Sequence, residues 1–395
     1  KAVLVLSEAV LVLSKAVLVL DLSREALSST GSTSTGEAPE HEHEHEHEVE
    51  HEVEHEHEYE YEHELKNSKL GFEFLKRFPM VGRVMLTLVA CCAPSSAFHA
   101  WAEHRVLLQG QDRLAIVEPN GVISWEMPWG GIHDLHLLDN GRILTRQGKA
   151  AVVEIDRENK QVVWRYDSGS QNGNAGKKVE VHAFERLPDG STMIAESGVA
   201  RIIEVDRDGS LLREIPLVVE NPSTHSDTRL VRATDAGTYL VAHEADGKVR
   251  EYDRETGEVV WEYLVPMFGK EPKRGHGPEA FGNRLFAALR LPGGNTLIAT
   301  GNGHSVIEVT PQKEIVWQVH QDDLPGIRLA WVTTLEVLPG GNRVLGNCHA
   351  GPGQPLLVEI DPKTKEVVWT LDRHRDFGNN VSNSLLLDAV GRSLR

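Results

Sequence analysis

Histidine and arginine side chains recur ahead of short apolar segments of this chain, in a combination that could catalyse group transfer. The set comprises His133, His182, His225, Arg229, Arg284 and Asn383, together with His276 in a Gly-His-Gly sequence. A mechanism through a covalent phospho- or sulfo-histidine needs a neutral imidazole as the nucleophile and cations that neutralise the developing oxyanion. Histidine and arginine gathered at one site would supply both.

These residues also have a structural explanation, because two of them occupy equivalent points of a repeat. His133 and His182 each lie eight residues before the glycine of a turn, at Gly141 and Gly190. Polar side chains that merely line a wet channel would show the same spacing. We favour channel lining over catalysis, and the sequence singles out none of the histidines as a nucleophile.

The elements that must position these residues form a repeat, in which an aspartate precedes a tryptophan by eight residues. The pairs are Asp156 and Trp164, Asp253 and Trp261, and Asp361 and Trp369; variants with shorter turns end at Trp125 and Trp317, and a degenerate copy has Arg213 in place of the tryptophan. The six copies lie 39, 49, 48, 56 and 52 residues apart. Repeats of this length indicate propeller blades or solenoid units.

Each repeat is expected to contain four strands. In the second repeat, segments 132–139, 142–148, 150–156 and 161–167 are apolar or β-branched and are separated by turn residues. The first copy lacks an innermost strand, whereas segment 379–392 resembles an innermost strand without partners. The sequence therefore predicts an all-β fold, a six-bladed β-propeller of four-stranded antiparallel blades, whose ring closes when 379–392 completes the first blade.

The aspartates and tryptophans of the repeat have structural roles in this interpretation. Asp156, Asp253 and Asp361 each precede the outer hairpin of a blade, where the carboxylate can accept hydrogen bonds from the amides of its own turn. The tryptophan that follows is expected to pack between adjacent sheets. Any chemistry would then lie at the opposite edge of each blade, on the inner strands.

The motif Asp-x-x-Thr-Gly-x-x-x-Trp, which runs from Asp253 to Trp261, resembles the tryptophan-docking repeat of propellers of the pyrroloquinoline-quinone type. The resemblance extends over nearly all of residues 104–390. It implies one of several activities, since the superfamily includes quinoprotein alcohol dehydrogenases, a lipoprotein scaffold of outer-membrane assembly and arylsulfotransferase-like enzymes.

The quinone dehydrogenases resemble this chain least, because they have eight blades and an adjacent Cys-Cys pair beside the quinone. The only adjacent cysteines here are Cys91 and Cys92, within a segment that resembles an export signal. We therefore expect no bound quinone, no other cofactor and no metal site. The arylsulfotransferase-like enzymes have six blades and a channel histidine, which makes them the first alternative. A carbohydrate- or peptide-binding propeller is the second, with Trp129 and Trp331 as stacking residues.

The first part of the chain is not predicted to belong to the propeller. Residues 1–79 contain three near-identical heptads and a His-Glu alternation, which predict a disordered, low-complexity segment from upstream read-through. The alternating residues could bind zinc or nickel adventitiously. Residues 80–100 have the basic, apolar and small-residue order of a signal peptide. Either Cys91 is lipidated within a lipobox-like sequence, or cleavage after Ala97 releases a soluble periplasmic protein.

Charge and cysteine content limit the partners of the propeller, which we place at residues 101–395. Residues 91–395 hold 33 Lys and Arg against 41 Asp and Glu, so this part is mildly acidic and lacks the excess of basic residues typical of nucleic-acid binders. Apart from Cys91 and Cys92, Cys348 is the only cysteine. We predict an exported binding or scaffold module of the cell envelope rather than an enzyme. Its partner would be an envelope protein or a small ligand at the propeller face, and contact with the membrane would come only through a lipid anchor.

Overall fold

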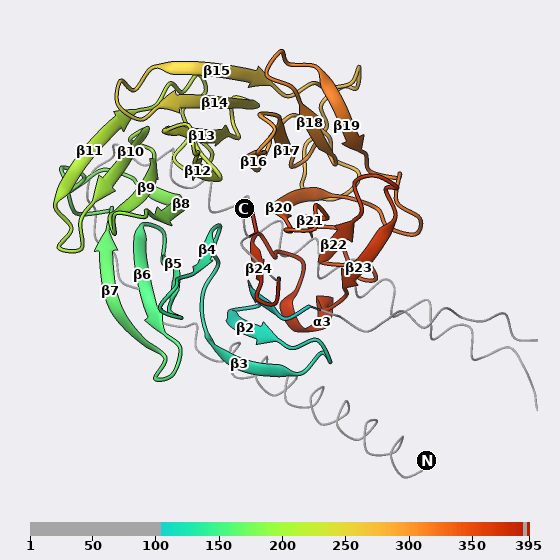
Figure 1. Ribbon diagram of the computed structural model, residues 1–395, viewed down its shortest axis with the longest axis horizontal. Helices are drawn as coiled ribbons and strands as arrows, with labels where there is room; N and C mark the ends of the chain where they lie inside the picture. Colours follow the sequence, from blue (N-terminus) through green and yellow to red (C-terminus); the bar gives the residue numbers. More distant parts are fainter. Residues whose placement is uncertain (1–103, 390–392) are drawn as a thin grey trace, which may run out of the picture. The chain divides into compact units, whose positions relative to one another are not determined.

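The structure, a computed structural model, describes residues 104–389 and 393–395. The predicted low-complexity segment 1–79 and export segment 80–100, with Cys91, lie outside the described residues. Six four-stranded antiparallel sheets are arranged around a common axis, each with its strands ordered from the axis outward (Figure 1). The prediction of a six-bladed, all-β propeller is confirmed.

We number the blades in chain order. Blade 1 consists of β24 (Ser384–Leu386), β1 (Val106–Gly110), β2 (Arg113–Val117) and β3 (Ile123–Pro128). Blade 2 consists of β4 (Leu135–Leu137), β5 (Ile143–Gln147), β6 (Ala151–Asp156) and β7 (Gln161–Asp167). Blade 3 consists of β8 (Glu180–Arg186), β9 (Thr192–Ser197), β10 (Arg201–Val205) and β11 (Leu211–Pro216).

The second half of the ring repeats the pattern. Blade 4 consists of β12 (Val231–Ala233), β13 (Thr238–His243), β14 (Lys248–Asp253) and β15 (Val259–Leu264). Blade 5 consists of β16 (Ala287–Arg290), β17 (Thr296–Ala299), β18 (Val306–Val309) and β19 (Ile315–Val319). Blade 6 consists of β20 (Trp331–Val337), β21 (Arg343–Cys348), β22 (Leu357–Ile360) and β23 (Val367–Leu371), after which the one-turn helix α3 (His374–Phe377) leads back toward blade 1.

The ring closes as predicted, because β24 pairs with β1 and supplies the missing inner strand of blade 1. The paired segment is shorter than the predicted 379–392, since pairing is limited to Ser384, Leu385 and Leu386. The inner strand of blade 2 is also shorter than predicted, at three residues. The residues before it bond to the closing segment, where the Asn383 side chain donates to the His133 carbonyl at 3.0 Å, so they are held outside the regular ladder.

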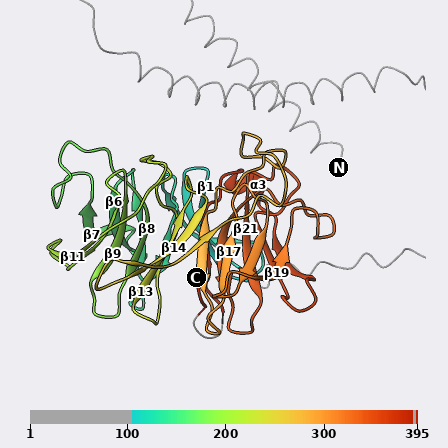
Figure 2. The same ribbon diagram turned by 90° about the horizontal axis from the view of Figure 1, so that it is seen from above.

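The hydrophobic core lies between the blades. Each of the six clusters of buried apolar side chains draws on two neighbouring blades, and the one containing Val106, Leu357 and Trp369 joins blade 6 to blade 1. Seen from the side, the strands run between the two faces of the ring (Figure 2). The second and third strands of the blades lie between neighbouring sheets and are buried almost continuously, as in β9 and β13. The outer strands alternate between partly buried and exposed residues, as in β3.

In four of the six blades, the tryptophan of the outer strand anchors its blade to the next one. The indole nitrogens donate to carbonyls in the following outer turn, in the pairs Trp125 to Arg157 (2.8 Å), Trp164 to Arg207 (2.8 Å), Trp261 to Pro311 (3.0 Å) and Trp317 to Pro362 (2.7 Å). Arg213, which replaces the tryptophan in the degenerate copy, donates to the equivalent carbonyl of Arg254 at 3.1 Å. Trp369 differs, because its buried indole nitrogen has no hydrogen-bond partner among residues 104–389 and 393–395, and His104 packs edge-on against its ring.

The aspartates of the repeat lie at the start of these turns. Asp156 accepts a hydrogen bond from the Glu158 amide at 3.0 Å, and Asp253 accepts one from the Thr256 amide at 2.7 Å. Asp361 accepts one from the Lys363 amide at 2.7 Å. The turn and the carbonyl that receives the next tryptophan are thus held together. No helix in the described part of the chain is long and apolar enough to cross a membrane.

Candidate functional site

The inner strands deliver their leading residues to one end of the axis. In a ring of antiparallel blades linked in the same way, all inner strands run in the same direction, so the residues at their starts converge. His133 precedes β4, Glu180 and His182 lie at the start of β8, and Arg229 precedes β12. Blades 2, 3 and 4 therefore contribute polar side chains to a common site.

Three histidines from these blades meet there. The ring centroids of His133 and His182 lie 4.6 Å apart, those of His182 and His225 lie 5.3 Å apart, and those of His133 and His225 lie 5.9 Å apart. All three contacts are edge-to-face. His182 is fully buried, whereas the side chain of His225 is 62% exposed. We call these three residues the histidine cluster; it runs from the interior of the ring to its surface.

Glu180 joins the cluster through one carboxylate oxygen. Its Oε2 lies 2.8 Å from Nδ1 of His225 and 3.2 Å from Nε2 of His182. The other ring nitrogen of His182, Nδ1, lies 2.9 Å from the carbonyl oxygen of Thr228. The pairing of β8 with β9 shifts register between Val181 and Ala183, so His182 lies at a β-bulge, a feature that redirects side chains near functional sites.

Three arginines, Arg229, Arg284 and Arg146, lie around the cluster. Nη1 of Arg229 donates to the carbonyl of His225 at 2.7 Å and lies 3.3 Å from Nδ1 of His182, and its guanidinium is paired with Glu244. Arg284 reaches the same Glu244 at 3.6 Å and is itself 55% exposed. Arg146 donates to backbone carbonyls on blades 2 and 3, including that of Val181 at 3.2 Å. Arg229 and Arg284 are thus joined through a shared buried carboxylate.

Burial and neighbouring cations keep the inner histidines uncharged. Burial lowers the pKa of His182 to about 3, and the charge of Arg229 acts in the same direction. The pKa of His133 is lowered well below its usual value, first by burial and then by His182, Arg229 and Arg146. Burial raises the pKa of Glu180, but its contacts with His182 and His225 lower the pKa more. A neutral imidazole therefore stands next to an ionised carboxylate.

His133 retains an unused polar atom. Its Nδ1 is buried and has no hydrogen-bond partner among the described residues. A neutral imidazole nitrogen without a partner, flanked by guanidinium groups, has the chemical character of a nucleophile or of a hydrogen-bonding site for an anionic group.

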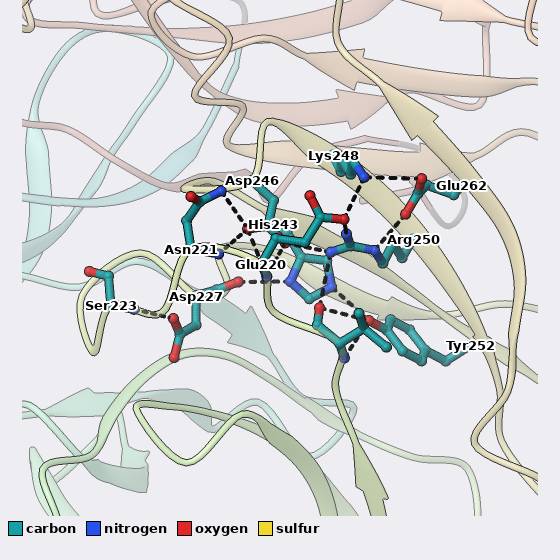
Figure 3. A network of polar contacts seen from close by, with 11 residues as sticks. Glu220, Asn221, Ser223, Asp227, His243, Asp246, Lys248, Arg250, Tyr252 and Glu262 are labelled. Atoms are coloured by element: carbon teal, nitrogen blue, oxygen red, sulfur yellow. Dashed lines mark hydrogen bonds and ion pairs between the residues drawn. The ribbon is translucent and has the colours of Figure 1, made fainter.

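The segment between β11 and β12, which carries His225 and Arg229, is fixed by a polar network (Figure 3). Asp246 accepts hydrogen bonds from the backbone amides of Glu220 and Asn221 at 3.1 and 2.8 Å. Arg250, only 1% exposed, donates to Asp246 at 2.6 Å and to the Val218 carbonyl at 2.9 Å. The beginning of the segment is thereby tied to blade 4.

The same network holds the part of the segment nearest the cluster. His243 contacts the Asp227 carbonyl at 2.9 Å through Nδ1 and the Tyr252 hydroxyl at 3.0 Å through Nε2 (Figure 3). The Asp227 carboxylate accepts from the amides of Ser223 at 2.5 Å and Gly198 at 2.8 Å. His225 is therefore carried on a braced turn even though its side chain is exposed.

A further buried ion pair links blades 2 and 4 across the axis. The Asp134 carboxylate accepts from both terminal nitrogens of Arg232, at 2.7 and 2.8 Å, and neither residue is more than 5% exposed. The Asn383 side chain, from the closing segment, reaches the same carboxylate at 3.3 Å. Asn383 is thus part of this structural network rather than of the histidine cluster.

His276 lies apart from the contacts that define the cluster. Its ring lies tilted against those of Trp331 and His349 of blade 6, with ring centroids 4.8 and 5.0 Å apart. The proposed stacking residues Trp129 and Trp331 are only 8% and 6% exposed. The indole of Trp129 also donates to the Arg146 carbonyl at 2.9 Å, so it serves the framework.

The structure brings together four of the residues that the sequence singled out, which are His133, His182, His225 and Arg229. The partners of these residues were not predicted from the sequence. Glu180 is two residues before His182 on one strand, a spacing that could have signalled a shared side. Glu244 and Arg146 come from other strands and reach the site only through the ring geometry. Their charges gave no local signal in the sequence.

The sequence profile described as outer membrane protein assembly factor BamB matches residues 110–371. Among solved structures, a protein of unknown function from Bacteroides caccae is 24% identical with a TM-score of 0.59, over 71% of this chain and 97% of that chain. A streptogramin B lyase is 12% identical (TM-score 0.45; 66% and 76% covered), and virginiamycin B lyase from Staphylococcus aureus is 13% identical (TM-score 0.43; 70% and 78% covered). The comparison with curated proteins gives no match.

Proposed function

Because the chain belongs to the family described as outer membrane protein assembly factor BamB, we propose that it is an exported binding or scaffold propeller of the cell envelope. The family name concerns protein assembly at the outer membrane, which supports a protein partner there. The protein would reside in the periplasm, either as a soluble domain or anchored through a lipidated Cys91. The observation that carries the proposal is the convergence of side chains from three blades at one end of the axis.

The binding surface in this proposal is the end of the ring that carries the histidine cluster. His225 and Arg284 are 62% and 55% exposed, while the groups behind them are buried and fixed. A rigid, polar centre with a few exposed donors suits recognition of a carboxylate or another anionic group on a partner. We propose that the protein acts without a bound quinone, since its ring has six blades and the quinone enzymes that the repeat resembles have eight.

Co-purification from envelope fractions tests this function. The full chain, the double variant His225→Ala/Arg284→Ala and a control, Val260→Ser/Val368→Ser, are produced in the source organism and isolated after mild cross-linking. The control residues are exposed on the outer strands, at 55% and 53%. A defined partner should be lost only from the first variant. A partner retained equally by all three proteins, or recovery of the chain from the cytoplasm alone, would count against the proposal.

A second candidate function is transfer of a sulfuryl or phosphoryl group through a channel histidine. The buried, unpartnered Nδ1 of His133 favours it, because Arg146 and Arg229 stand nearby to neutralise an oxyanion. Incubation of the purified protein with an aryl sulfate would then release the phenol, and His133→Ala would abolish the release. An aryl phosphate is tested in the same way, and no turnover of either donor by the wild-type protein would eliminate this alternative and leave the binding function.

A further inference from the structure

Three side chains of the site have the composition and separation of a metal-binding set. Three ligand atoms all lie within 4.8 Å of one another. They are one carboxylate oxygen of Glu180 and one ring nitrogen each of His182 and His225. Two of the three separations are 3.2 and 2.8 Å. Ligand atoms around a tetrahedral zinc ion lie about 3.4 Å apart, since each is about 2.1 Å from the metal. Small rotations of the exposed His225 ring would complete that geometry.

The hydrogen bonds of His182 leave a mismatch at the centre of this set. A carbonyl oxygen only accepts, so the 2.9 Å contact with Thr228 places the ring proton on Nδ1. Arg229 lies farther from this nitrogen, at 3.3 Å, and has the His225 carbonyl as its nearer acceptor. Nε2 of His182 therefore presents a lone pair to the Glu180 carboxylate at 3.2 Å. Two acceptors at this distance require a positive species between or beside them.

The surroundings of His182 match those of a metal-ligating histidine. Such histidines donate their second ring N–H to a carbonyl or carboxylate, which fixes the tautomer and the ring orientation. The Thr228 carbonyl does this, and the side chain of His182 is fully buried. A residue that only lined a wet channel would need neither the bulge nor the fixed tautomer.

We propose that Glu180, His182 and His225 bind a divalent transition-metal ion, and that Zn²⁺ is the ion they fit best. Two imidazoles and one carboxylate are zinc ligands, and with three protein ligands a fourth position stays available for water or an anionic group. That position would face the exposed His225 side, where a ligand can approach. This site is independent of whether the protein acts as an envelope scaffold.

Nearby cations set the expected strength of binding. Arg229 is paired with Glu244, and Arg146 donates to backbone carbonyls, but their charges still oppose a second cation. Lys149 also lies 3.4 Å from the other oxygen of Glu180. We therefore expect micromolar rather than picomolar affinity for zinc.

Thermal unfolding of the full chain with and without zinc chloride tests the site. The His-Glu segment at residues 40–64 is the same in every variant, so any zinc it takes up is common to all of them. The readout is therefore the zinc-dependent shift in Tm, compared between variants after EDTA treatment. Wild type should gain about 4 °C when free zinc exceeds the Kd a hundredfold. His225→Ala should lose this gain because one of the three ligands is removed. The variant should still fold, because the exposed side chain of His225 can be removed without loss of packing. His374→Ala should keep the gain, because His374 lies in α3, which contacts β1 of blade 1 and contributes nothing to the three-residue set.

A second variant and an anomalous difference map of the zinc-loaded crystals complete the test. Glu180→Gln keeps a polar side chain for His225 but removes the charge, so its Tm in EDTA should stay near that of wild type while the zinc shift disappears. Crystals of the zinc-loaded protein should give an anomalous peak among the three side chains at the zinc edge. A zinc shift unchanged in both variants, an absence of any shift in wild type, or anomalous peaks only elsewhere would overturn the proposal.

Discussion

Replacement of Arg232 by methionine should strongly destabilise the propeller, because it leaves a buried carboxylate without its counter-charge. Asp134 is completely buried and its bidentate contact with Arg232 spans blades 2 and 4. Removing one partner of a buried ion pair costs about 3–5 kcal/mol. For a domain near 290 residues, with an unfolding entropy of about 0.6 kcal/mol per degree, this corresponds to a fall in Tm of about 5–8 °C.

The pH dependence of this loss identifies its cause. Burial raises the pKa of Asp134, but the charges of Arg232 and His136 lower it more, so the folded pKa lies well below the ordinary 3.8. In the wild type, this contribution to stability is present above pH 3.8 and is lost as the pH falls further. In Arg232→Met, the interaction with His136 remains but the larger one with the arginine is gone, so burial should raise the folded pKa of Asp134 above 3.8. Protonation of Asp134 would then reduce the destabilisation between pH 7 and pH 4.5.

Urea unfolding of both proteins at pH 7 and pH 4.5 measures the effect. Arg165→Met is the control, since Arg165 pairs with Asp167 at 2.8 Å but both side chains are exposed, at 45% and 36%. This variant should lose less than about 1 kcal/mol. A loss in Arg232→Met no larger than that of the control, or one that is equal at both pH values, would refute the reasoning.

Three further perturbations follow from the same contacts. Arg250→Ala should cost about 3–5 kcal/mol in urea unfolding, because its buried carboxylate partner stays behind, and should disorder the turn that carries the histidine cluster, as hydrogen exchange would show. A hydrogen bond to Glu359 raises the pKa of His104. The contact between protonated His104 and Glu359 should therefore contribute fully to stability below pH 6.5, and this contribution should be lost as the pH rises through the folded pKa. In His104→Asn, stability should no longer depend on pH in this way. Trp164→Phe should lose about 1 kcal/mol in thermal unfolding, since the donor to the Arg207 carbonyl is removed, and unchanged stability would argue against this role.

The repeat predicts the outer part of the molecule well because each of its residues acts locally. The aspartate bonds to its own turn, and the tryptophan reaches a carbonyl that lies at the same point of the next repeat. Arg213 shows that the position matters more than the residue type, since a side chain of different chemistry at the tryptophan position still donates to the equivalent carbonyl. The number of blades and the closing strand follow from counting such units.

The site is less predictable because its contacts join residues that are distant in the chain. His225 approaches His182 through the long connection between β11 and β12, whose path depends on Asp246 and Arg250. Nothing periodic marks these residues. His276, which the sequence also offered as a candidate, lies against Trp331 instead. Inner-strand position alone therefore predicts which residues face the axis, and long-range ion pairs decide which of them meet.

Site-specific photo-cross-linking in the source organism tests the central claim, that the end of the ring bearing the histidine cluster is the binding surface. A photoreactive amino acid is placed in turn at His225, at Arg284 and, on the outer strands, at Val260 and Val368. We predict one discrete adduct from the first two positions and none from the outer pair. An adduct that forms only from the outer strands would contradict the claim.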